Sequence, residues 1–162
     1  MIKDGASHSN VDTYSPAEES TLRGVHLDVD EGVCAEVEGF LLSHGLPVTV
    51  RRVATLNELR RALDNDAVDM VFADYRGSGF EGSEALRAVR GTLPDVPVIF
   101  ISSENSDATA TEAILSGACD YVYKGGLTRL LPAIRRVQRE KTERHGREAS
   151  DRRVDVLLSR QR

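Results

Sequence analysis

The sequence has little of several residue types that mark particular classes of protein. It contains no tryptophan, two cysteines, and only four tyrosines and four phenylalanines in 162 residues. Cys34 and Cys119 lie far apart in apolar surroundings, which predicts free thiols and a reducing, cytoplasmic location rather than a disulfide framework or a metal pair. No apolar run approaches the roughly 20 residues of a membrane-spanning helix. We therefore expect neither a disulfide-rich secreted domain nor a membrane protein.

Charge is distributed unevenly along the chain, whose formal net charge is −5. Residues 1–128 carry ten Lys and Arg against twenty-one Asp and Glu, whereas residues 129–162 carry eleven against five. The acidic body argues against nucleic-acid binding by the main domain, because such binding depends on basic surfaces. The basic part after residue 139 is too short for a helix-turn-helix or zinc motif, so we expect no direct DNA binding.

Composition divides the chain into three segments. Residues 1–22 are rich in Ser, Asp, Glu and Gly and lack the apolar core of a secretory signal, which predicts a disordered N-terminal tail. Residues 23–140 form the predicted domain. Residues 141–162 predict a basic helical extension or linker.

Short apolar runs alternate with amphipathic stretches five times along the predicted domain. The apolar runs, which predict strands, are 24–29, 47–54, 68–74, 96–102 and 119–124. The amphipathic stretches, which predict helices, are 32–45, 55–65, 82–94, 106–117 and 128–146. Five βα units in succession predict a doubly wound α/β fold, in which helices cover both faces of a parallel five-stranded sheet.

Polar residues follow four of the five predicted strands, at the edge where doubly wound proteins place their functional groups. They are Asp30 and Glu31, Asp74, Ser102 and Lys124. Carboxylates, a hydroxyl and an ammonium at one edge are the groups required for phosphoryl transfer to a carboxylate. One acid is the nucleophile and another holds a divalent cation, while the hydroxyl and the ammonium take up the remaining charge.

Three motifs occur in order along the chain: "VDMVFADYRGSGFEGSEAL", "PVIFISS" and "GACDYVYK". Together they resemble the receiver domain of two-component response regulators, of the chemotaxis-regulator-like kind, and the resemblance covers about residues 24–139. It implies a flavodoxin-like sheet with strand order 2-1-3-4-5. It also implies a signalling domain that is not an enzyme beyond catalysing its own phosphorylation and dephosphorylation.

The resemblance assigns the phosphorylation chemistry to individual residues. Asp74 is implied to be the phospho-acceptor and Lys124 the ion-pair partner of the phosphoryl group. Asp30 is implied to be a direct ligand of Mg²⁺, together with Asp74 itself and the main-chain carbonyl of Arg76. Gly82 matches the glycine that closes the loop after the acceptor.

The resemblance also implies a switch and a set of partners. Ser102 matches the hydroxyl that follows the phosphoryl group, and Tyr121 matches the aromatic residue whose rotamer reports phosphorylation. The phosphoryl donor is expected to be a histidine kinase or a phosphotransfer protein. The output is expected to be a protein–protein interaction face.

One departure from the family pattern concerns the cation. Receiver domains usually show two adjacent acids after the first strand, whereas here the first of the two positions is Val29 and the second is Asp30. Glu31 lies one position later and can substitute as a ligand. We therefore expect weakened Mg²⁺ binding, and a degenerate receiver that acts without phosphorylation stays open as an alternative.

A second alternative comes from the stretch "HLDVDEG". It resembles the first motif of haloacid dehalogenase-type phosphatases, in which Asp28 would be the nucleophile and Asp30 the general acid. No acidic pair follows Lys124 to complete that metal site, and the phosphatase interpretation leaves Asp74 unexplained. The receiver interpretation is therefore preferred, with Asp28 pointing along the strand without a role.

The last predicted helix carries apolar residues on one face. They are Leu130, Leu131, Ile134 and Val137. Such a face packs on the sheet, and its continuation can pair with a second copy of the chain or dock a partner. A homodimer through the last helix is one expectation for this part of the chain.

Overall fold

The computed structural model describes residues 20–159, with side chains up to residue 151. The strands are β1 (Leu22–Leu27), β2 (Val48–Val53), β3 (Met70–Ala73), β4 (Arg76–Gly77), β5 (Phe80–Glu81), β6 (Val98–Ser102) and β7 (Asp120–Tyr123). The helices are α1 (Glu31–Ser43), α2 (Leu56–Asn65), α3 (Gly82–Thr92), α4 (Asp107–Leu115) and α5 (Leu130–Ser159), with a 3₁₀ turn at Leu127–Arg129.

Five parallel strands form one sheet in the order β2-β1-β3-β6-β7. Numbered within the sheet alone, this is the order 2-1-3-4-5, so the predicted doubly wound topology is confirmed. β3 and β6 are buried along their whole length, as expected for central strands covered on both faces. The short pair β4-β5 forms a separate antiparallel hairpin that the sequence pattern did not predict.

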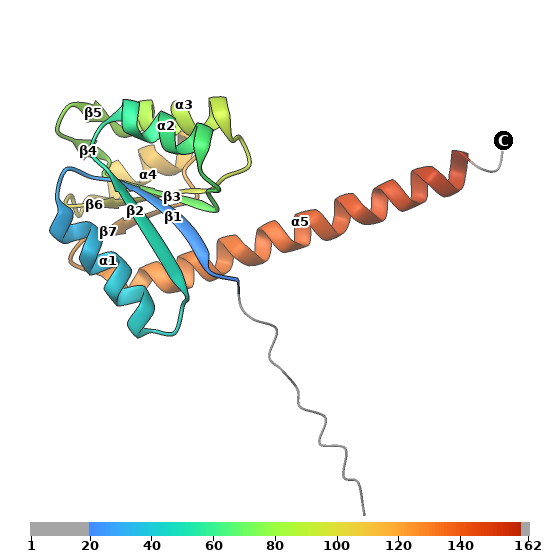
Figure 1. Cartoon of the computed structure of the whole chain (residues 1–162), viewed down its shortest axis with the longest axis horizontal. Helices are drawn as coiled ribbons and strands as arrows, with labels where there is room; N and C mark the ends of the chain where they lie inside the picture. Colours follow the sequence, from blue (N-terminus) through green and yellow to red (C-terminus); the bar gives the residue numbers. More distant parts are fainter. Residues whose placement is uncertain (1–19, 160–162) are drawn as a thin grey trace, which may run out of the picture.

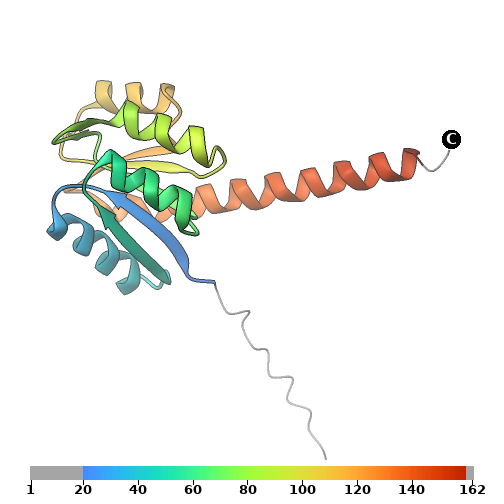
Figure 2. The ribbon, with the colours of Figure 1, turned by 45° about the horizontal axis from the view of Figure 1, so that its top comes forward.

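Two hydrophobic clusters lie on opposite faces of the sheet. The first unites α2, α3 and α4 with side chains such as Leu27, Val71 and Phe100. The second unites α1 and α5 with side chains such as Phe72 and Ile101. Figures 1 and 2 show the resulting three layers, with the sheet between the two groups of helices.

Helix α5 begins on the sheet and then leaves it. Its first turns are buried against the second cluster, with Leu130 and Ile134 fully covered. Pro132 is tolerated because it stands in the first turn, where its missing N–H has no helical partner. The helix continues without a break to Ser159 and projects far from the domain (Figure 1).

The expected segment boundaries fall differently on the structure. Leu22, placed in the N-terminal tail by composition, is the first residue of β1, while residues 1–19 lie outside the described part. Residue 140 falls inside α5, whose helix also includes residues 141–159 of the predicted extension. None of the helices in the described part of the chain is both long and apolar enough to cross a membrane. Cys34 and Cys119 are both free thiols, as predicted.

His26 is an unusual core residue. Its side chain is 0% exposed, packs edge-on against Phe72, and leaves both ring nitrogens without a hydrogen-bond partner. Burial is the main cause that lowers the pKa of His26 to about 4. The negative charge of Asp28 raises this pKa, and the positive charge of Lys124 lowers it. The imidazole is therefore neutral in the folded chain at ordinary pH.

This burial predicts acid sensitivity. Between the folded pKa of about 4 and the unfolded value of 6.5 the unfolded chain binds more protons, so the free energy of unfolding should fall as pH drops. The contribution of His26 over that window is about 3 kcal/mol. Urea unfolding followed by circular dichroism should show a clearly flatter pH profile between pH 6.5 and 4 in His26→Leu. The exposed His145→Gln should keep the wild-type profile, and equal profiles for all three chains would contradict this account.

Candidate functional site

The register of the sheet brings two acids together. Leu27, the last residue of β1, pairs with Ala73, the last residue of β3. Asp28 and Asp74 each follow immediately, so they stand side by side at the carboxyl edge of neighbouring parallel strands. The Asp74 N–H donates to the Leu27 carbonyl at 2.9 Å, and this hydrogen bond continues the register of β1 and β3 past their last residues. Asp28 is 1% exposed and Asp74 is 8% exposed.

Lys124 bridges these two carboxylates. It follows β7, and its main-chain N–H donates to the carbonyl of Ser102 at 2.8 Å. Its Nζ lies 2.9 Å from Oδ2 of Asp28 and 3.4 Å from Oδ2 of Asp74. Two buried carboxylates thus share one ammonium, which leaves the cluster with a net negative charge.

Burial and charge act on the ionisation of this cluster in opposite ways. Burial raises the pKa of Asp74 and the Asp28 charge adds to that effect, while Lys124 opposes both. Burial by itself lowers the pKa of Lys124, but its contacts with Asp28 and Asp74 outweigh burial and raise it. The ammonium is therefore firmly held, and Asp74 is an acid whose negative charge is only partly compensated.

The predicted switch residues lie beside the cluster. Ser102 ends β6, is 1% exposed, and its Oγ accepts the N–H of Glu104 at 3.1 Å. Tyr121 is 6% exposed in β7, and its hydroxyl donates to the Glu104 carbonyl at 2.8 Å. Burial raises the pKa of Tyr121, so this hydroxyl is a donor at all ordinary pH values. Tyr121 therefore adopts an inward rotamer tied to the loop that follows β6.

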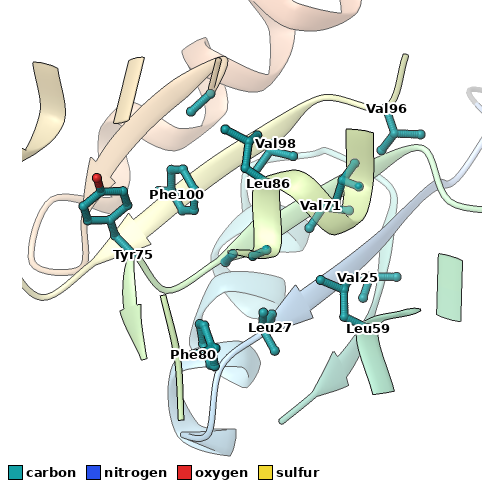
Figure 3. Packing of buried hydrophobic residues seen from close by; sticks show 14 of the residues in the cluster. Val25, Leu27, Leu59, Val71, Tyr75, Phe80, Leu86, Val96, Val98 and Phe100 are labelled. Carbon is teal, nitrogen blue, oxygen red and sulfur yellow. The ribbon is translucent and has the colours of Figure 1, made fainter. Parts of the chain in front are cut away.

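The residue after Asp74 anchors the site to the core. Tyr75 is buried, and its ring meets Phe100 at 5.0 Å and Tyr121 at 5.8 Å, both edge-on; Figure 3 shows the Tyr75 and Phe100 rings together at the end of the sheet. Gly82 donates its N–H to the Tyr75 carbonyl at 2.7 Å. A Cβ on Gly82 would lie 2.6 Å from Cδ2 of Tyr75 and 2.8 Å from that carbonyl oxygen, so only glycine closes the loop this tightly.

The structure does not bring Asp30 or Glu31 to this cluster. The Asp30 carboxylate caps α1 by accepting the N–H groups of Gly32 and Val33 at 2.8 and 3.3 Å. The Glu31 carboxylate lies 3.0 Å from Nη2 of Arg52. Both are exposed, and helix capping explains the position of Asp30 because an N-cap acid satisfies otherwise unpaired amides.

Asp28 takes the place expected for Asp30. The expectation that Asp28 points along the strand without a role is wrong, because Asp28 is the buried partner of Lys124. Its Oδ1 also accepts the Asp30 N–H at 2.9 Å. Val29, 48% exposed, stands between the buried acid and the capping acid. The position next to Asp28 therefore carries no carboxylate.

Comparison with known proteins decides the family. The model of the response regulator receiver domain matches residues 27–135. This chain belongs to the receiver domain family. The family assignment gives no support to the phosphatase alternative, and Asp28, at 1% exposed, is less accessible to a substrate than Asp74, at 8%.

The receiver resembles part of several larger regulators. It is 30% identical to the regulatory protein LuxO of Vibrio vulnificus over 57% of this chain and 20% of that protein. It is 32% identical to the transcriptional regulatory protein ZraR of Klebsiella oxytoca over 60% of this chain and 22% of that protein. The crystal structure of NtrX from Brucella abortus superposes with a TM-score of 0.67 at 27% identity, covering 82% of this chain and 30% of NtrX. The chain thus spans about a fifth of the length of the curated relatives it matches.

Proposed function

We propose that this receiver accepts a phosphoryl group on Asp74 from a histidine kinase or a phosphotransfer protein. The observation that carries the proposal is the bridge of Lys124 between Asp28 and Asp74 at the ends of adjacent strands. A carboxylate oxygen of Asp74 forms a bond to phosphorus while the bond from phosphorus to the donor's histidine nitrogen breaks. The product is an acyl phosphate on Asp74 and a free imidazole on the donor.

The surrounding groups suit the charge of that product. Lys124 already faces Asp74 and can pair with a phosphoryl oxygen, and the hydroxyl of Ser102 lies at the end of the neighbouring strand β6. Lys124 is held in place before the reaction, so it can stabilise developing charge with little rearrangement, whereas the Ser102 hydroxyl would reach the phosphoryl group by a short movement. Loss of the phosphoryl group to water, catalysed by the domain itself, would reset the site.

Receiver domains generally bind Mg²⁺ beside the phosphorylated aspartate. Oxygen donors are present here, since Asp28, Asp74 and the main-chain carbonyl of Arg76 have the chemistry that Mg²⁺ prefers. These three would hold the cation in place of the set expected from sequence, and the cation would supply charge neutralisation for the phosphoryl oxygens. Asp28 is already engaged by Lys124, and the described residues offer no group of three or more acidic, His or Cys side chains. We therefore propose a weak cation site.

The output is proposed to be a protein–protein interaction face controlled by Ser102 and Tyr121. Movement of Ser102 toward a phosphoryl group would change the β6–α4 loop, to which the Tyr121 hydroxyl is bonded. A homodimer through α5 is a further proposal, supported by the length of that helix beyond the domain. Free thiols support action in the cytoplasm.

The experiment that tests this function uses beryllofluoride, which mimics a phosphoryl group. In the presence of Mg²⁺ we expect it to shift the NMR signals of Lys124, Ser102 and Tyr121 in the wild-type chain. Asp74→Ala should show none of these changes, while Asp64→Ala, an exposed acid on α2, should respond like the wild type. A wild-type chain without any response would favour the degenerate receiver, which the missing acid at Val29 keeps as the second candidate.

A further inference from the structure

Glu104 connects four separate parts of the site. It lies in the loop between β6 and α4, and its N–H donates to Oγ of Ser102 at 3.1 Å. Its carbonyl accepts the Tyr121 hydroxyl at 2.8 Å. Its Oε2 accepts the Thr109 hydroxyl at 3.1 Å and lies 3.6 Å from Nε of Arg76. The main chain and the side chain of one residue thus join β6, β7, α4 and the loop that follows Asp74.

Arg76 is the one of these partners that can leave without disturbing the core. It stands two residues after Asp74 in the hairpin strand β4, and its side chain is 56% exposed. The Glu104 side chain is 42% exposed. Ion pairs between exposed side chains contribute only about 0–1 kcal/mol, so this contact holds the loop weakly and can be exchanged.

A phosphoryl group on Asp74 would compete directly for Arg76. An acyl phosphate carries more negative charge than a carboxylate and offers several strong acceptor oxygens. Arginine binds phosphate oxygens through two parallel N–H donors, which makes such pairs stronger than a single exposed contact with a carboxylate. Arg76 begins β4 only two residues after Asp74, so the new partner would appear close to the guanidinium.

We propose that Arg76 is a positioning residue that exchanges Glu104 for the phosphoryl group on Asp74. The exchange removes the only cation that the structure places against the Glu104 carboxylate among the described residues, and leaves that carboxylate on Thr109 alone. The loop between β6 and α4 then becomes free to move, and the Glu104 carbonyl that accepts the Tyr121 hydroxyl moves with it. This inference rests on the proposed function and adds a second path to the switch, alongside Ser102.

If this exchange occurs, a variant that lacks either Arg76 or the Glu104 charge should resemble the phosphorylated state before any phosphoryl mimic is added. In Arg76→Met and in Glu104→Gln, the NMR signals of Thr109 and Tyr121 should already lie close to their positions in the beryllofluoride-treated wild type. Combining the two substitutions should add little further change, because both remove the same contact. Arg87→Met, an exposed arginine on α3, is the matched control and should keep the untreated wild-type signals.

Adding beryllofluoride and Mg²⁺ completes the test. In Arg76→Met the Lys124 signals should still shift, which reports binding at Asp74, whereas the additional shifts of Thr109 and the Glu104 amide should be at most about half of those in the wild type. Wild-type-sized shifts of Thr109 and Glu104 in this variant would overturn the role of Arg76 and leave the acceptor role of Asp74 standing. Absence of any response at Lys124 in the wild type would overturn the proposed function and this inference together.

Discussion

Replacing Lys124 with methionine is expected to lower the free energy of unfolding by about 3 kcal/mol at neutral pH, because the substitution leaves a buried carboxylate without its counter-charge. Asp28 is 1% exposed and has its Oδ2 against the ammonium, so water cannot replace the lost partner. Asp74, the second carboxylate of the cluster, would then repel Asp28 without compensation. Urea denaturation followed by circular dichroism measures the loss.

Two matched variants separate this effect from the loss of a lysine stem. Lys141→Met, at a half-buried position of α5 near Leu22 and Asp69, should change the free energy of unfolding by less than about 1 kcal/mol, because it breaks no buried ion pair. Asp28→Asn added to Lys124→Met should recover part of the stability, since it removes the unpaired charge. If Lys124→Met has the same free energy of unfolding as Lys141→Met, the ion pairs of Lys124 do not stabilise the folded chain and this account is contradicted.

The second large effect is a gain. Val29→Asp is expected to tighten Mg²⁺ binding by at least about tenfold, equivalent to about 1.4 kcal/mol. Val29 is 48% exposed beside Asp28, so a carboxylate there needs little desolvation. It would be a third acid next to Asp28 and Asp74, whose charges are now partly cancelled by Lys124. Isothermal titration calorimetry with MgCl₂ gives the affinity directly.

Val29→Asn is the control for that gain, because an asparagine side chain has nearly the same size as aspartate but carries no charge. The Val29→Asn chain should bind Mg²⁺ about as weakly as the wild type. Mg²⁺ should also raise the melting temperature more in Val29→Asp than in Val29→Asn or the wild type. Equal affinities for the Asp and Asn variants would mean that the position next to Asp28 does not face the cation. The weak site would then need another explanation than the missing acid.

The sequence predicted the fold and most of the site because both depend on short-range patterns. Alternating apolar and amphipathic stretches determine a doubly wound sheet, and polar residues directly after buried strands identify Asp74, Ser102 and Lys124 as neighbours. Asp74 and Ser102 follow or end the fully buried strands β3 and β6, and Lys124 follows β7, in which the two central residues are buried. No knowledge of packing was required to place them at one edge.

The sequence did not indicate that Asp28, rather than Asp30, lies beside Asp74 and Lys124, because this depends on where β1 ends. A signal was available: "VHLD" matches "VFAD", and the first three residues of each segment pair with one another in β1 and β3, directly before the two aspartates. Asp30 also precedes a helix, where an acid commonly caps the first turn. The contacts of Glu104 with Tyr121 and Arg76 could not be predicted, since they depend on how loops after separate strands fold against one another, which no short-range pattern records.

The most direct test of the account is to locate the phosphoryl group. The wild-type chain is incubated with acetyl phosphate and Mg²⁺, the acyl phosphate is reduced with borohydride, and mass spectrometry of peptides identifies the modified residue. The account predicts modification of Asp74, with Asp28 and Asp30 unmodified, and no modification in Asp74→Asn. Modification of Asp28, or labelling that persists in Asp74→Asn, would contradict it.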